Sequence, residues 1–130
     1  MKNALRVLLS VPLLLLSIQA EDKATSLRDA QSAVDSNLQT PEGKAYDAQL
    51  SKEFPDKYTD TMRQCKQSAG GDLRSFWVLI KLSQNGSANE VLLYPSTKLG
   101  ECTRETLLKG KLSPPPKADY WVSIYLKLSH

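Results

Sequence analysis

Two apolar runs that flank an Asn-Gly pair constrain the fold of this chain most strongly. Phe76–Leu82 and Glu90–Tyr94 are rich in β-branched and aromatic residues, which is typical of strands. Asn85-Gly86 lies between them, and this dipeptide is the strongest short-range signal for a β-hairpin. A third run, Tyr120–Leu128, alternates in polarity and predicts a last strand with one face in the core.

Helical patterns precede the hairpin. Residues 21–39 carry a thin apolar stripe, which predicts either a polar helix or a flexible lead-in. Thr40 and Pro41 are typical of a helix start, with the threonine as cap and the proline at the first helical position. Pro55 should interrupt this segment, and a second helix is expected from Pro55 to about Gln67.

The two cysteines are 37 positions apart and predict a structural disulfide. Cys65 would lie in the last turn of the second helix, and Cys102 would open a short helix that ends near Lys111. A loop of this size contributes about 3–4 kcal/mol in the chain-entropy model. The alternatives are a redox site, which favours closer spacing, and a zinc site, which needs more ligands than this pair and the terminal His130.

The first twenty residues differ from the rest and predict a cleavable signal peptide. Lys2 and Arg6 precede the apolar run Val7–Leu16, and Ala20 supplies a small residue at the expected cut. The alternative is an uncleaved membrane anchor, which needs about 20 apolar residues, roughly twice the length of this run. We therefore expect a periplasmic or secreted protein, with no stable membrane anchor after cleavage.

Charge and residue inventory argue against several function classes. The chain has 17 basic and 14 acidic residues, but loss of Lys2 and Arg6 with the leader would leave a net charge of +1. This balance does not favour nucleic acid as a partner. The sequence shows no nucleophile–base pair, metal-ligand cluster or phosphate-binding loop. We therefore expect no enzyme activity and no cofactor.

Together these patterns predict an α+β protein. The expected core is a small three-stranded antiparallel sheet, made of the hairpin plus the C-terminal strand, with helices packed on one face and linked by the disulfide. The expected organisation is a signal peptide at 1–20, a polar helical or flexible lead-in at 21–39, and a single domain at 40–130.

The segment FWVLIKLSQNGSANEVLLYPSTKLGEC, preceded by a helix and followed by a short helix, three prolines and an alternating strand, resembles the periplasmic C-terminal domains of the TonB and TolA type. The similarity covers roughly Phe54 to Leu128. It implies protein–protein contact in the cell envelope, often by accepting an extended peptide at a sheet edge. Energy transducers of that type also have a membrane anchor and a long spacer. Neither is expected here, so the domain should not transmit force.

Two functional hypotheses follow. In the first, the chain is a periplasmic protein-binding or adaptor module that uses a sheet edge or the strand face carrying Trp77, Trp121 and Tyr125. These aromatic residues are either covered by the N-terminal helices or exposed as a partner-binding patch. In the second, the chain is a secreted inhibitor or immunity-like protein that blocks an exported enzyme with the rigid segment Ser113–Lys117.

Overall fold

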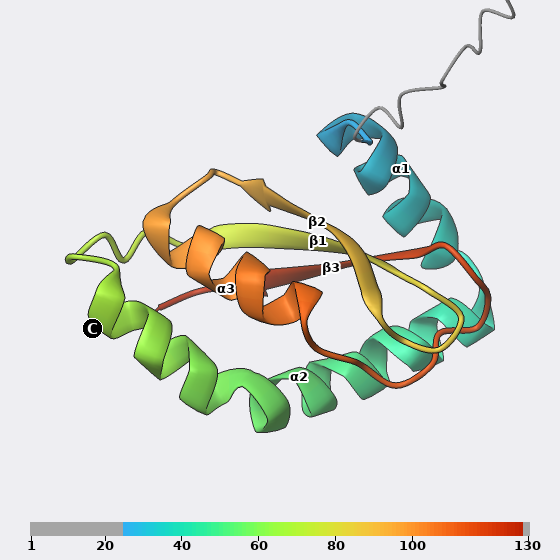
Figure 1. Cartoon of the computed structure of the whole chain (residues 1–130). Coiled ribbons are helices and arrows are strands. Elements are labelled where there is room, and N and C mark those ends of the chain that lie inside the picture. The colour runs from blue at the N-terminus through green and yellow to red at the C-terminus, as the bar shows by residue number, and fades with distance from the viewer. Residues whose placement is uncertain (1–24, 129–130) are drawn as a thin grey trace, which may run out of the picture.

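The strand β1 (Phe76–Leu82) lies at the centre of an antiparallel sheet, between β2 (Ala88–Tyr94) and β3 (Tyr120–Leu126). Figure 1 shows this computed structural model. It describes residues 25–128, so the predicted leader at 1–20 and the terminal His130 lie outside the described residues. The predicted hairpin and C-terminal strand are confirmed, and with them the α+β class.

The hairpin turn closes at Gly86, as the sequence predicts. The N–H of Gly86 donates to the carbonyl of Ser83 at 2.9 Å, and its φ of 91° is favourable only for glycine. A Cβ at this position would lie 1.9 Å from the carbonyl oxygen of Leu112. Glycine is therefore required both by the turn and by the close approach of the chain that leads into β3.

Two helices pack on the sheet face that carries Phe76, Val78 and Ile80, which we call the inner face. These helices are α2 (Pro41–Ser68) and α3 (Lys98–Leu108). The disulfide between Cys65 and Cys102 joins them, with a Cα–Cα distance of 5.6 Å, and Cys65 lies in the last turn of α2 as predicted. The core between these layers also includes Leu50, Phe54, Tyr58, Leu99, Leu107, Tyr120 and Val122.

The predicted break at Pro55 is wrong, because α2 is one continuous helix of 28 residues. Thr40 caps it by accepting the N–H of Gly43, and Pro41 follows at the first position, as predicted. Pro55 lies at the centre of the helix, where its ring removes one backbone hydrogen bond. The helix bends in this region and curves around the sheet (Figure 1), so the proline redirects the helix instead of ending it.

The third helix begins four residues before the predicted start at Cys102. Thr97 is its cap and accepts the N–H of Gly100 at 2.9 Å. Leu99 is completely buried against the core. Leu99 and Gly100, which precede the predicted start, therefore belong to the first turn of the helix.

Residues 21–39 contain a further helix, α1 (Leu27–Asn37), which supports the helical alternative for this segment. It packs on the opposite sheet face, the outer face, where Ala30 and Val34 contact Leu79 and Trp121. The structure thus adds one short helix on the outer face to the predicted helix layer on the inner face.

A tight junction joins α1 to α2. A Cβ on Gly43 would lie 1.8 Å from the carbonyl oxygen of Asn37, so only glycine allows the end of α1 to approach α2 this closely. Leu38, Gln39 and Thr40 make the connection. This junction holds α1 against the start of β3.

Candidate functional site

The outer edge of β3 carries backbone groups that do not pair within the sheet. The N–H of Ser83 donates to the carbonyl of Ser87 at 2.9 Å, so odd-numbered residues of β1 point their backbone groups toward β2. Adjacent residues of a strand point these groups to opposite sides. The even-numbered residues of β1 therefore point their backbone groups toward β3, where they hydrogen-bond with the even-numbered residues opposite them. The N–H and C=O groups of Trp121, Ser123 and Tyr125 therefore point away from the sheet.

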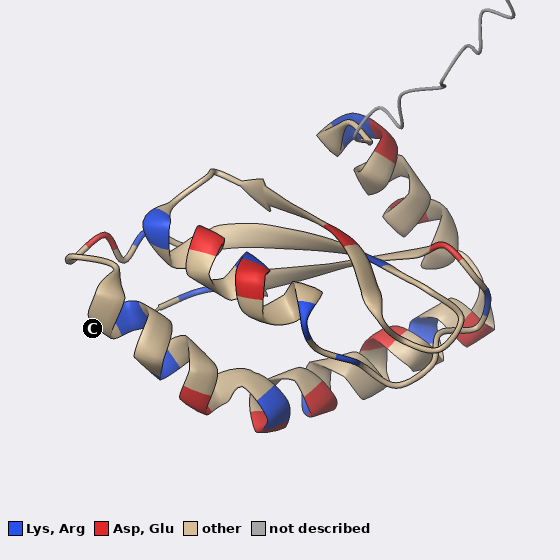
Figure 2. Ribbon diagram, viewed as in Figure 1, with Lys and Arg blue, Asp and Glu red and all other residues tan. Residues whose placement is uncertain are grey.

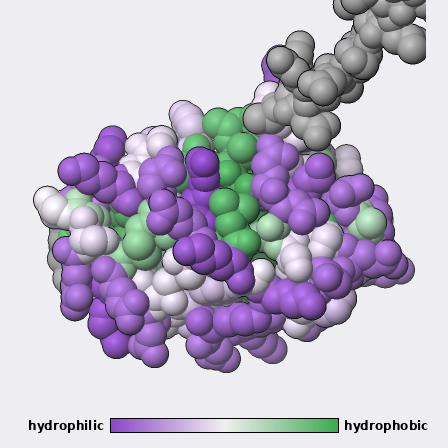
Figure 3. All heavy atoms as spheres, viewed as in Figure 1, coloured by the Kyte–Doolittle hydropathy of each residue, from purple (hydrophilic) through white to green (hydrophobic). Residues whose placement is uncertain are grey.

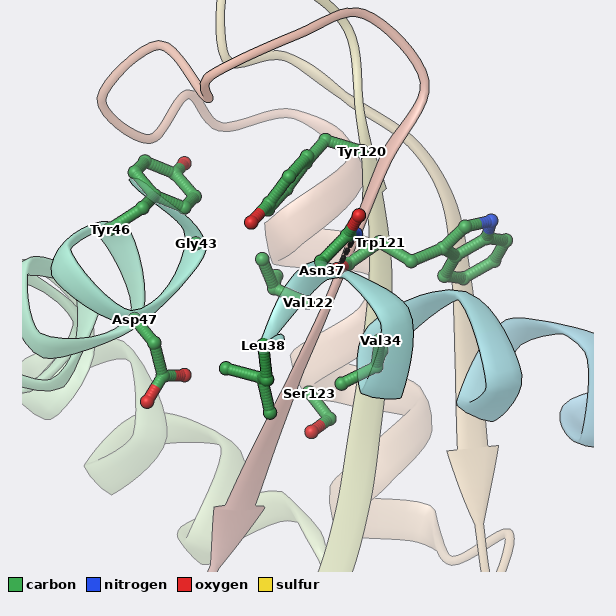
Figure 4. Close-up of a pocket in the computed structure, with 10 residues that line it drawn as sticks. All are labelled: Val34, Asn37, Leu38, Gly43, Tyr46, Asp47, Tyr120, Trp121, Val122 and Ser123. Atoms are coloured by element: carbon green, nitrogen blue, oxygen red, sulfur yellow. Dashed lines mark hydrogen bonds between the residues drawn. The ribbon is translucent and has the colours of Figure 1, made fainter. Parts of the chain in front are cut away.

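The junction between α1 and α2 covers the start of this edge. The side-chain amide of Asn37 donates to the carbonyl of Trp121 at 3.0 Å, and Figure 4 shows this contact beside a cavity of only about 10 Å³. Within residues 25–128, the outward N–H and C=O groups of Ser123 and Tyr125 form no hydrogen bond. The edge of β3 is therefore covered at its start and open from Ser123 onward.

A groove of about 440 Å³ lies between the second half of α2 and the end of β3. We call it the α2–β3 groove. Its apolar lining consists of Phe54, Pro55, Tyr58, Met62, Leu126 and Leu128. Its polar lining consists of Thr59, Arg63, Lys66 and Lys127. Among the described residues no carboxylate lines it, and Figure 2 shows the basic positions on the last turns of α2 and at the end of β3.

The three aromatic residues selected from the sequence do not share one environment. Trp77 and Tyr125 face each other across β1 and β3, with ring centroids 4.8 Å apart, and both are about half exposed. Trp121 is buried beneath α1, with only 6% of its surface exposed. The helix thus covers one of the three and leaves the other two on the surface.

Sequence reasoning missed Tyr94 of β2. It lies opposite Trp77 of β1, and its side chain is 62% exposed. Its ring and Trp77 line a groove of about 320 Å³ on the outer face, bounded by Leu27 and Arg28 of α1. The hairpin turn alone does not reveal it, because the Ser83–Ser87 pairing would put Leu93 opposite Trp77, and only the register shift between Lys81 and Leu82 moves Tyr94 there. The exposed aromatic surface therefore extends across all three strands.

Apolar surface is also present on the face that carries α3. Figure 3 shows a narrow hydrophobic stripe over β2 and α3, bordered by hydrophilic residues. Leu108 is 42% exposed, and Leu93 is less exposed than Leu108. None of the grooves described above lies on this stripe, which distinguishes it from the open edge of β3.

The segment Ser113–Lys117 is fixed at its base. The hydroxyl of Tyr46 donates to the carbonyl of Ser113 at 2.7 Å, and the N–H of Ser113 donates to the Glu53 carboxylate at 2.8 Å. Lys57 also donates to the carbonyl of Lys111. Pro114, Pro116 and Lys117 are exposed beyond this base, so the segment has a rigid root and an accessible tip.

Raising the pH above about 10 should destabilise the fold. Burial raises the pKa of Tyr46, Tyr58 and Tyr120 above the ordinary value of 10.0, with the nearby carboxylates of Glu53 and Asp47 adding to the effect. The unfolded chain therefore loses these protons first, and stability that is complete below pH 10 declines as pH rises toward the folded-state pKa values. The limiting slope is about 1.4 kcal/mol per pH unit for each tyrosine.

Urea unfolding between pH 8 and 12 would measure this slope. Tyr46→Phe should flatten it, while costing about 1 kcal/mol at neutral pH through the lost hydrogen bond to Ser113. Trp77→Phe is the matched control, because it changes a ring that is 43% exposed and removes no ionisable group, so the slope should stay unchanged. Equal slopes in all three proteins would contradict the assignment.

The described residues give no sign of a metal centre or of a membrane span. Within residues 25–128 no group of three or more His, Cys, Asp or Glu side chains is placed to hold a metal ion. No helix in that range is both long and apolar enough to cross a bilayer. Comparison with protein-family models, curated proteins and solved structures found no match.

Proposed function

We propose that this protein is a protein-binding or adaptor module of the cell envelope that accepts an extended segment as an added strand at β3. The observation that carries the proposal is the set of outward backbone groups at Ser123 and Tyr125, for which no described residue provides a partner. Such groups on an edge strand hydrogen-bond readily to another extended chain. This is binding by β-augmentation, and it needs no cofactor.

The surroundings of the open edge support this site. The α2–β3 groove lies on its inner side and can receive alternate side chains of an added strand. The rings of Trp77 and Tyr125 lie on its outer side and provide the aromatic surface that is common at binding hot spots. The other edge, on β2, is interrupted by a bulge opposite Lys81 and Leu82 and is bounded by Pro95, so it offers a shorter regular ladder.

Two further features support a place among modules of the TonB and TolA type. The order helix, strand, strand, helix, strand over α2 to β3 is the order that the sequence resemblance implies. The disulfide between Cys65 and Cys102 suits an oxidising compartment such as the periplasm. Under this proposal the chain acts in the envelope on a protein or an extended peptide.

Ser123→Pro should abolish strand addition, and Ser123→Ala should preserve it. Proline removes the outward N–H while leaving the pairing with β1 intact, which edge strands tolerate, whereas alanine retains that N–H. Short random peptides displayed on phage would be selected on the immobilised protein, and their affinities for the three forms compared. We expect a loss of more than about tenfold for the proline variant, corresponding to at least about 1.4 kcal/mol.

Amide chemical shifts would locate the peptide. Binding at β3 should shift the resonances of Ser123 and Tyr125 and leave those of Val91 and Leu93 on β2 unchanged. The proposal fails if no peptide is selected, if the proline variant binds as tightly as the parent, or if the shifts occur on β2. Circular dichroism of both variants checks that they remain folded.

A second candidate, a secreted inhibitor or immunity-like protein, is favoured by the anchored segment Ser113–Lys117. Tyr46 and Glu53 hold the base of this segment, so its exposed tip loses little conformational freedom when it enters a cleft. In this case Pro116→Gly and Lys117→Ala would weaken binding to one folded exported enzyme. Ser123→Pro would have no effect, which separates the two proposals.

A further inference from the structure

We infer that the segment accepted at β3 presents apolar side chains toward α2 and is acidic at the end that lies beside Leu128. This inference rests on the proposed function, because it describes the chemistry of the partner at the same edge. It is carried by the lining of the α2–β3 groove, which combines apolar side chains with three basic side chains and, among the described residues, no acidic one.

Strand geometry determines which side chains of the partner enter the groove. Successive side chains of a strand alternate between the two faces of a sheet, and neighbouring strands lie about 4.8 Å apart. A strand added beside Ser123 and Tyr125 therefore directs every second side chain to the inner face. There it would meet Tyr58 and Met62 of α2 and the partly buried Leu126, so these positions of the partner should be apolar.

Two basic side chains near the end of β3, one from α2 and one that follows the strand, form no salt bridge within residues 25–128. Among the described residues, neither Lys66 nor Lys127 takes part in a salt bridge, although both line the groove. Arg63 does form a pair with Asp60 at 3.1 Å, but the two side chains are 68% and 87% exposed, so this contact is weak. The end of the edge therefore has an excess of positive charge that an acidic partner can neutralise.

One carboxylate, that of Asp47, lies near the first half of β3. Asp47 of α2 lines the same small cavity as Tyr120 and Ser123 of β3, and its carboxylate lies on the side of Leu38 (Figure 4). An acidic residue of the partner would be repelled there and attracted near Lys127. The charges along the edge thus define which end of the bound segment is acidic.

The test uses peptide selection on the full protein and on two charge variants. Lys66→Glu with Lys127→Glu reverses the charge of the groove. Lys98→Glu with Lys109→Glu makes the same change in net charge at the two exposed ends of α3, where neither residue lines the groove or the cavity beside Asp47, and serves as the matched control. The parent and the control should select peptides that combine alternating apolar residues with Asp or Glu near one end.

The groove variant should bind those acidic peptides roughly tenfold more weakly and should instead select Lys or Arg at the same position. Added salt should weaken the acidic peptides on the parent protein and leave neutral ones almost unchanged. Selection of peptides that bind at Ser123 without any acidic preference would overturn this inference and leave strand addition standing. Selection of no peptide on any form would overturn the proposed function itself.

Discussion

Replacing Trp121 with alanine is expected to lower the free energy of unfolding by about 3–5 kcal/mol, the usual cost of removing a buried aromatic side chain. The indole is only 6% exposed and forms a small core with Leu79, Ala30 and Val34. Truncation would leave a cavity between α1 and the sheet. The loss should appear as a lower midpoint in urea unfolding monitored by circular dichroism.

Trp77→Ala is the matched control on the same sheet face. This ring is 43% exposed and lies against the ring of Tyr125, so its removal should cost about 1 kcal/mol. Comparison of the two variants distinguishes the two roles that the strand alternation suggested for these tryptophans, burial beneath a helix and exposure to a partner. Equal losses in the two variants would mean that α1 does not cover Trp121 in solution.

Replacing both cysteines with serine is expected to destabilise the fold by about 3–4 kcal/mol. The bond between Cys65 and Cys102 closes a loop over a separation of 37 residues, and opening it restores that conformational freedom to the unfolded chain. The loop contains the whole β-hairpin and the turn into α3. Urea unfolding of the oxidised parent and of the double variant would give the difference.

The reduced parent protein is the control for side-chain effects. Cys65 is almost completely buried, so serine also places a hydroxyl in the core, whereas reduction leaves both sulfur atoms in place. The reduced protein and the double variant should lose similar stability if loop closure dominates. A difference of less than about 1 kcal/mol between the oxidised and reduced proteins would contradict the loop argument.

The elements with strong local signals could be predicted from the sequence. Asn85-Gly86 locates the hairpin, and the alternation from Tyr120 locates the last strand, because side-chain direction in a strand follows sequence parity. The helix start at Thr40 was also clear, since its side chain satisfies an N–H of the first turn. These features depend on residues that are close together in the chain.

Features that depend on tertiary contacts could not be predicted in this way. Pro55 usually ends a helix, but here the apolar positions on both sides of it, Phe54 and Tyr58, pack into one core and keep α2 continuous. The placement of α1 on the outer face depends on the approach of Asn37 to Gly43, which no periodicity reveals. Burial of Trp121 follows from that placement.

The candidate site shows the same division. The aromatic residues Trp77 and Tyr125 were identified from strand parity, and the register brings them together. The α2–β3 groove on the inner side of the edge was missed, because its basic side chains come from α2 and from the end of the chain after β3, which are far apart in the sequence. Lys66 and Lys127 look like ordinary surface charges until the fold places them at one groove.

The contact between Asn37 and Trp121 also bears on how copies of this protein behave at high concentration. An edge strand that is unpaired along its whole length is a template for sheet growth from molecule to molecule. Here the side-chain amide occupies one end of β3 and leaves a short remainder, from Ser123 to Leu126. The remaining edge is long enough to pair with a short added strand. Because the Asn37 contact shortens it, less of the edge is available for the nucleation of fibrils.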